Sequence, residues 1–183
     1  MNNVFFSSDF HFSHYNLMKA LNRPFGSIEE MNDKIISNFF SFVSKGDMVY
    51  FLGDLSWDVR VAEDFFKRLW EKSINFYFIH GNHDKDIRNE LLNKYCRWNG
   101  WIKDISIDNQ KISLCHYMML SWNCSHHGAW HLHGHHHDAE QSKKAVGKVL
   151  NVCTDLHGFR PVSFEDVREY MKNRPDNWDL IKK

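Results

Sequence analysis

The stretch MVYFLGD, at residues 48–54, decides the fold class of this chain. Its first five residues are all apolar, as expected of a strand that is buried on both faces of a parallel sheet. Gly53 and Asp54 then follow, so a carboxylate comes directly after a buried strand. Open α/β sheets bind ligands beyond the carboxyl ends of their strands. The stretch therefore predicts an α/β protein with a site at that edge.

Four further polar motifs each follow an apolar run in the same way. They are Asp9-Phe10-His11, Gly81-Asn82-His83-Asp84, the single His116, and Gly134-His135-His136-His137. Because each falls where a predicted strand ends, one edge could bring all of these side chains together. The glycines fit this interpretation, since glycine permits a sharp turn or a close approach of the backbone to a ligand.

Hydrophobic periodicity predicts the elements around these motifs. Strands are expected at residues 3–8, 48–52, 74–79, 102–107, 111–116, 130–134 and 148–153. Helices are expected at residues 27–44, 59–71, 84–95 and 163–172. Strand and helix alternate in the first half and strands dominate the second, which predicts two packed mixed sheets with helices outside.

Turn and cap residues mark several boundaries of these elements. Ser27 is predicted to cap the first long helix, with Glu30 completing a capping box. Asp108-Asn109 forms the expected hairpin turn between two strands. The polar tail after Pro175 is expected to pack loosely.

Composition restricts the function classes that fit this chain. Its 183 residues suit one domain, expected to span residues 1–183. Lys plus Arg equals Asp plus Glu at 23 each, and this zero formal charge argues against a dedicated nucleic-acid surface. No stretch approaches the ~20 apolar residues of a membrane span. No signal-peptide pattern opens the chain.

The four cysteines predict a reducing compartment. They form no C-x-x-C pair and no dense framework, so reduced thiols in the cytoplasm are expected. A structural zinc site built from Cys115, Cys124 and His126 or His127 is the alternative, but its spacing matches no standard finger.

The five motifs together supply a donor set for two divalent metals. Imidazoles and carboxylates suit Mn, Fe, Zn or Ni, and a shared carboxylate holds two ions ~3.5–4 Å apart. Asp9 and Asp54 offset only part of the charge of two such ions, and Asn82 is neutral. The surplus favours an anionic substrate such as a phosphate ester. A water bridging the ions would lose a proton readily and attack phosphorus in line.

In this order, the motifs resemble the five signature motifs of the calcineurin-like metallophosphoesterase superfamily. The resemblance covers residues 9–137, and the chain is similar to the small single-domain bacterial and phage members. It implies a four-layer α/β/β/α sandwich of two mixed sheets flanked by helices. It also implies a centre of two divalent transition metal ions, with manganese favoured over iron, zinc or nickel.

The resemblance assigns roles to the motif residues. The first metal takes Asp9, His11 and His137, the second takes Asn82, His116 and His135, and Asp54 bridges both. His83 contacts phosphate and protonates the leaving oxygen, and Asp84 orients His83. An imidazole whose pKa is ordinarily near 6.5 suits this general-acid role near neutral pH.

Residues near the motifs leave alternatives open. His126 and His127 rival the fourth motif as the metal-ligating histidine, but their Ser-His-His-Gly context resembles a loop. His14 could bind substrate or begin a helix, and Arg23 could clamp a phosphate oxygen or lie on the surface. Trp57 is expected to pack in the core rather than wall the site.

The sequence therefore predicts a metal-dependent phosphoesterase acting on a small phosphate ester, with diesters favoured. A second hypothesis, from a different class, is a non-catalytic metal-binding scaffold of the same fold. The superfamily includes a small retromer subunit of that kind, in which the motif histidine is replaced, whereas His83 is present here. A histidine-rich metal-storage protein would leave the ordered motifs unexplained.

Overall fold

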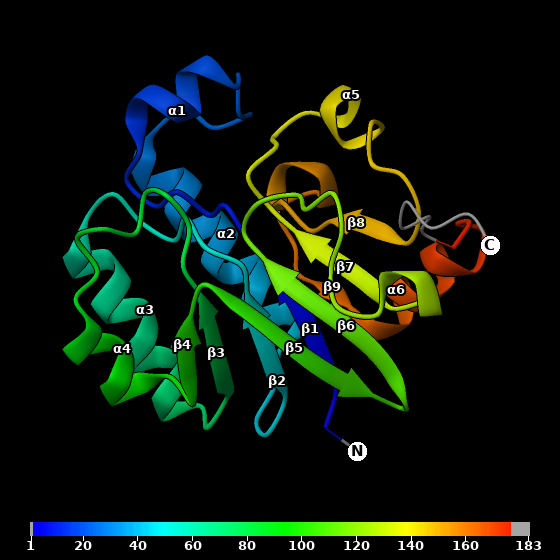
Figure 1. Cartoon of the computed structure of the whole chain (residues 1–183). Helices are drawn as coiled ribbons and strands as arrows, with labels where there is room; N and C mark the ends of the chain where they lie inside the picture. The colour runs from blue at the N-terminus through cyan, green and yellow to red at the C-terminus, as the bar shows by residue number, and fades with distance from the viewer. Residues whose placement is uncertain (1, 177–183) are drawn as a thin grey trace.

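The strands form two mixed sheets in the computed structural model, which describes residues 2–176 (Figure 1). The first sheet has the order β4 (Trp98–Gly100), β3 (Asn75–Ile79), β2 (Met48–Phe51), β1 (Val4–Ser7) and β9 (Val162–Ser163). The second has the order β5 (Ile102–Ile107), β6 (Gln110–Cys115), β7 (Trp130–His133) and β8 (Val149–Asn151). Only the β1–β9 and β5–β6 pairs are antiparallel among these strands of residues 2–176.

Helices flank the two sheets. They are α1 (Tyr15–Ala20), α2 (Ile28–Phe42), α3 (Val59–Glu71), α4 (Asn89–Tyr95), α5 (Ala139–Ser142) and α6 (Phe164–Lys172), with 3-10 turns at Ser125–His127 and Thr154–His157. Figure 1 shows α3 and α4 on one side of the sheets and α5 and α6 on the other. The predicted α/β architecture of two mixed sheets flanked by helices is confirmed.

Successive side chains along the strands of the first sheet alternate between two hydrophobic cores, one on each face of the sheet. Phe5 packs in the cluster beneath α2 and α3, whereas the next residue, Phe6, packs in the cluster between the sheets. Phe51 and Leu52 divide in the same way. Because successive side chains point to opposite faces, these strands are buried on both sides and need continuous apolar runs.

Most predicted elements form, and the differences have local causes. The hairpin turn is present, with Asp108 and Asn109 at φ values of 49° and 65°, as a tight two-residue turn requires. The short elements α1, α5, β4 and β9 were not predicted. Helix α4 begins at Asn89 and not at 84, because the backbone of the N-cap residue Arg88 is extended.

The predicted capping box of α2 is only half formed. Ser27 Oγ accepts the backbone N–H of Glu30 at 3.1 Å, but the Glu30 carboxylate accepts from Gly26 and not from Ser27. A complete box forms instead at α6, between Ser163 and Asp166.

Within residues 2–176, no helix is both long enough and apolar enough to cross a membrane. Residues 177–183, and with them most of the predicted loose tail, lie outside the described residues.

Candidate metal centre

The five motifs meet where strands of both sheets end. Asp9 follows β1, Asp54 follows β2, and His116 and His135 follow β6 and β7. The backbone N–H of Asp9 donates to Gly53 O at 2.9 Å, which joins the first two loops. The backbone N–H of His135 donates to Asp9 Oδ2 at 3.0 Å, which joins the two sheets.

Six of the predicted ligands form two groups of three. One group is Asp9, His11 and His137, and the other is Asp54, His116 and His135. Within each group, the candidate ligand atoms all lie within 4.8 Å of one another. The structure therefore brings together carboxylates and imidazoles that are far apart in the sequence.

Asp54 lies between the two groups. Its Oδ2 atom is 3.5 Å from His11 Nε2 in one group and 3.4 Å from His116 Nε2 in the other. Asn82 Oδ1 lies 3.2 Å from the same His116 nitrogen, which places the amide beside the second group. One oxygen of Asp54 therefore lies close to an imidazole of each group.

Three of the imidazoles have a partner at Nδ1, on the side of the ring away from the centre. The Nδ1 atoms of His116 and His137 lie 2.7 Å from Leu52 O and Asp155 Oδ2 respectively, and that of His11 lies 3.4 Å from His14 Nδ1. In each case Nε2 is left to face the carboxylates of the centre. Metal-ligating histidines are normally held by such a partner on the other ring nitrogen.

The residues present fit a pair of divalent cations. His11 Nε2 is buried and has no hydrogen-bond partner in the protein. A buried nitrogen without a partner is costly, and a cation would satisfy it. The donor set of carboxylates, imidazoles and one amide oxygen is that of Mn, Fe, Zn or Ni.

Electrostatics couple His116 to Asp54. Burial by itself raises the pKa of Asp54, but the hydrogen bond and charge of His116, together with His11, lower it to about 2. Burial lowers the pKa of His116, but Asp54 and Asp9 raise it to about 9. A cation that binds at His116 would therefore compete with the proton that these carboxylates favour.

The ligand loops adopt strained backbone conformations. Asp9, His11, Asp54 and His135 have φ values of 61°, 51°, 59° and 70°. Left-handed backbone at residues other than glycine costs about 1–3 kcal/mol each and is concentrated at functional sites. A Cβ on Gly81 would collide with the Asp54 carboxylate, which explains why that motif position is glycine.

Comparison with known proteins agrees with this geometry. The sequence model of the family described as calcineurin-like phosphoesterase matches residues 3–150. The chain belongs to this family. It is 32% identical over 169 residues to an uncharacterized protein, MJ1445, of Methanocaldococcus jannaschii, covering 90% of this chain and 89% of that protein.

The fold is also similar to a solved structure. The crystal structure of a protein of unknown function, AQ665 from Aquifex aeolicus, has a TM-score of 0.73 at 20% identity, over 93% of this chain and 100% of that one. At this identity the similarity concerns the fold alone. Family membership and the two ligand groups together support a metal-dependent phosphoesterase as the general class of this protein.

His83 lies beside the first ligand group. Its backbone N–H donates to Asp54 Oδ1 at 2.8 Å, and its ring is 5.4 Å from that of His11. The side chain is exposed, so a substrate can reach it. His14 lies close by, with its ring 5.7 Å from that of His83.

Trp57 is not in the core, contrary to the prediction. It is 58% exposed and stacks on His14, with ring centroids 4.4 Å apart and an interplanar angle of 15°. Its backbone N–H donates to Phe12 O at 2.8 Å, so the loop after Asp54 holds the indole at the surface.

Neither of the two alternatives for Arg23, a phosphate contact or a surface position, fits the structure. The guanidinium is buried and makes two hydrogen bonds, of 2.8 and 2.7 Å, to the Asp155 carboxylate. Its remaining N–H groups donate to the backbone of Asp9 and Phe10 and to the sulfur of Met31. All of its N–H donors are therefore used inside the protein. Arg23 binds the backbone carbonyls of the Asp9 loop.

Asp84 also differs from its predicted role. Its carboxylate accepts the backbone N–H groups of Gly81, Asp54 and Leu55 at 2.7, 2.8 and 2.9 Å. Burial raises its pKa, and the Asp54 charge adds to this effect. Asp84 therefore clamps two ligand loops together and does not orient the His83 ring.

Asp155 is a functional residue that the sequence motifs do not include. Its carboxylate accepts a hydrogen bond from His137 Nδ1 at 2.7 Å and forms an ion pair with Arg23. Burial raises the pKa of Asp155, but these two partners lower it to about 2. The sequence offers only a polar cluster after the last predicted strand, with no spacing that links Asp155 to His137.

The alternative histidines lie elsewhere. His126 and His127 are in the 3-10 turn, with ring centroids 4.1 Å apart, and belong to none of the three groups of potential metal ligands among the described residues, the third being His137, Cys153 and Asp155.

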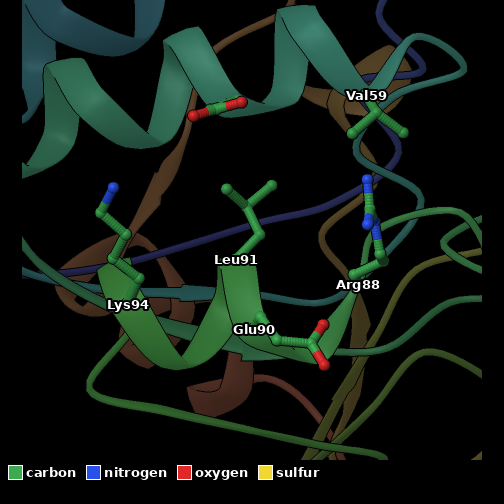
Figure 2. A pocket seen from close by; sticks show the side chains of 6 residues that line it. Val59, Arg88, Glu90, Leu91 and Lys94 are labelled. Carbon is green, nitrogen blue, oxygen red and sulfur yellow. The ribbon is translucent and has the colours of Figure 1, made fainter.

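A separate pocket of about 300 Å³ lies beside α3 and α4. Figure 2 shows side chains that line it, among them Val59, Arg88 and Leu91. No motif residue lines that pocket, so we assign the chemistry to the ligand groups.

Proposed function

We propose that the chain hydrolyses a small phosphodiester at a dinuclear manganese centre. The observation that carries the proposal is the position of Asp54, whose Oδ2 lies 3.5 and 3.4 Å from imidazoles of the two ligand groups. A carboxylate so placed can be shared by two cations. Family membership supports phosphoester hydrolysis as the reaction class.

The ligands divide as the two groups suggest. Asp9, His11 and His137 would hold one ion, Asn82, His116 and His135 would hold the other, and Asp54 would contact both. Two divalent ions in these positions supply Lewis acidity toward the phosphoryl oxygens and a water nucleophile near neutral pH.

His83 would serve as the general acid. Its backbone is fixed to Asp54, so its exposed ring stays beside the centre where the ester must bind. It would donate a proton to the leaving oxygen as the bond from phosphorus to that oxygen breaks. The same ring could also donate a hydrogen bond to the phosphoryl group before the proton is transferred.

The test is hydrolysis of bis-p-nitrophenyl phosphate and p-nitrophenyl phosphate by metal-stripped protein, with and without added Mn²⁺. We expect turnover of the diester only when metal is present. Two bound ions without turnover of either ester would instead support the non-catalytic scaffold.

Replacing His83 by Ala should leave the metal content nearly intact and lower turnover by roughly 10²–10⁴-fold. The loss should be greatest for diphenyl phosphate, because phenolate leaves less readily than p-nitrophenolate and needs the proton more. His127→Ala, at an exposed histidine outside the centre, is the control. Equal losses of turnover for diphenyl phosphate and bis-p-nitrophenyl phosphate would contradict the general-acid assignment.

A further inference from the structure

We infer that two aromatic side chains, Trp57 and Tyr117, hold the two organic groups of a diester on either side of the metal centre. This inference rests on the proposed function and adds the substrate class. The ester would carry planar ring groups, of the aryl or nucleoside kind, on both of its ester oxygens.

The first aromatic wall consists of Trp57 and His14. The stack touches the first ligand group through His14, whose Nδ1 lies 3.4 Å from His11 Nδ1. The indole ring is 6.0 Å from that of His83. A group attached to the oxygen that His83 protonates must therefore lie within reach of Trp57, which makes this the leaving-group side.

The second aromatic wall is Tyr117, which immediately follows the ligand His116. Its ring lies 5.1 Å from that of His116 and 4.8 Å from that of His135, at interplanar angles of 75° and 68°. Tyr117 is 43% exposed, so its ring is available to a ligand. Its ring contacts are with the second ligand group, whereas the ring of His83 contacts His11 of the first, so Tyr117 suits the retained ester group.

The charge around the centre favours a diester. A monoester presents a terminal dianionic phosphoryl group, which Arg side chains commonly bind. Arg23, whose guanidinium contacts the backbone of Asp9, donates all of its N–H groups inside the protein. Rings at both ends match the two aromatic walls, since planar groups stack on Trp and Tyr with little dependence on their exact chemistry.

The experiment compares bis-p-nitrophenyl phosphate with methyl p-nitrophenyl phosphate, in Mn²⁺-loaded protein. Both release p-nitrophenolate, so they differ only in the retained group. We expect kcat/KM, corrected for the uncatalysed rates, to be higher for the diaryl ester. Tyr117→Ala should lower kcat/KM for the diaryl ester roughly 5- to 100-fold and bring the ratio of the two esters toward one.

Trp57→Ala should lower kcat/KM for both esters, because both share the leaving group. Trp57→Phe and Tyr117→Phe should restore most of the loss, since each keeps a ring. Trp70 and Tyr170 are matched controls, with exposures of 58% and 41% outside the centre.

The possible failures are distinguishable. Hydrolysis of both esters with equal efficiency by the wild-type protein would overturn the ring-binding inference and leave the phosphoesterase function standing. An unchanged ratio of kcat/KM for the two esters in Tyr117→Ala would also overturn the ring-binding inference and leave the phosphoesterase function standing. Absence of any turnover would count against the proposed function itself, and with it the inference.

Discussion

At Asp155, one carboxylate joins a candidate metal ligand to a buried arginine. It accepts from His137 Nδ1 at 2.7 Å and from Arg23 on its other side. This contact selects the His137 tautomer whose Nε2 faces Asp9. The residue therefore controls a ligand that lies 18 positions earlier in the chain.

Replacing Asp155 by Asn should weaken metal binding roughly 10- to 100-fold, because one amide oxygen cannot serve both His137 and Arg23. Titration of metal-stripped protein with Mn²⁺ by calorimetry measures this. Asp86→Asn, at an exposed carboxylate, is the control. Unchanged affinity in Asp155→Asn would show that His137 does not depend on this partner.

At the scale of elements, Asp84 holds the loop after β2 against the loop after β3. Its carboxylate accepts hydrogen bonds from three buried backbone N–H groups, which would be unpaired without it. A side chain within a ligand motif thus acts on the backbone that carries the ligands.

Replacing Asp84 by Ala should lower the free energy of unfolding by about 3 kcal/mol or more, because each unpaired buried N–H costs about 1–3 kcal/mol. Urea unfolding of the metal-free protein measures this, which separates folding from metal binding. Asp86→Ala again serves as the control. A loss below about 1 kcal/mol would mean that water replaces the carboxylate.

At the scale of the whole molecule, buried imidazoles make stability depend on pH. Burial lowers the pKa of His133 to about 3, and it also lowers the pKa values of His131 and His11. A depressed folded-state pKa contributes stability that is complete above the ordinary value of 6.5 and is lost as the pH falls toward the folded value.

His133 should therefore lower the unfolding free energy of the metal-free protein by about 1.4 kcal/mol per pH unit below 6.5. Urea unfolding at several pH values between 7 and 5 measures the slope. In His133→Leu the slope should be smaller by about that amount. An identical slope in the variant would show that His133 takes up its proton in the folded state.

The local pattern of the sequence determined most of the ligand set. Each ligand motif follows its own apolar strand, and parallel strands deliver their ends to one edge, so Asp9 and Asp54 could be placed together from the sequence. The single sheet edge predicted for all the motifs is wrong, because His116 follows a strand of the second sheet. The continuous apolar runs likewise predicted two buried faces, which the two cores on either side of the first sheet confirm.

Only the tertiary structure decided what surrounds the ligands. Arg23 pairs with Asp155 across 132 positions of sequence, and Asp84 reaches Asp54 across 30. The exposure of Trp57 depends on how the loop after β2 is tied to Phe12. Strand and turn preferences act over a few neighbouring residues, whereas these contacts form only when distant loops meet, so no local pattern encodes them.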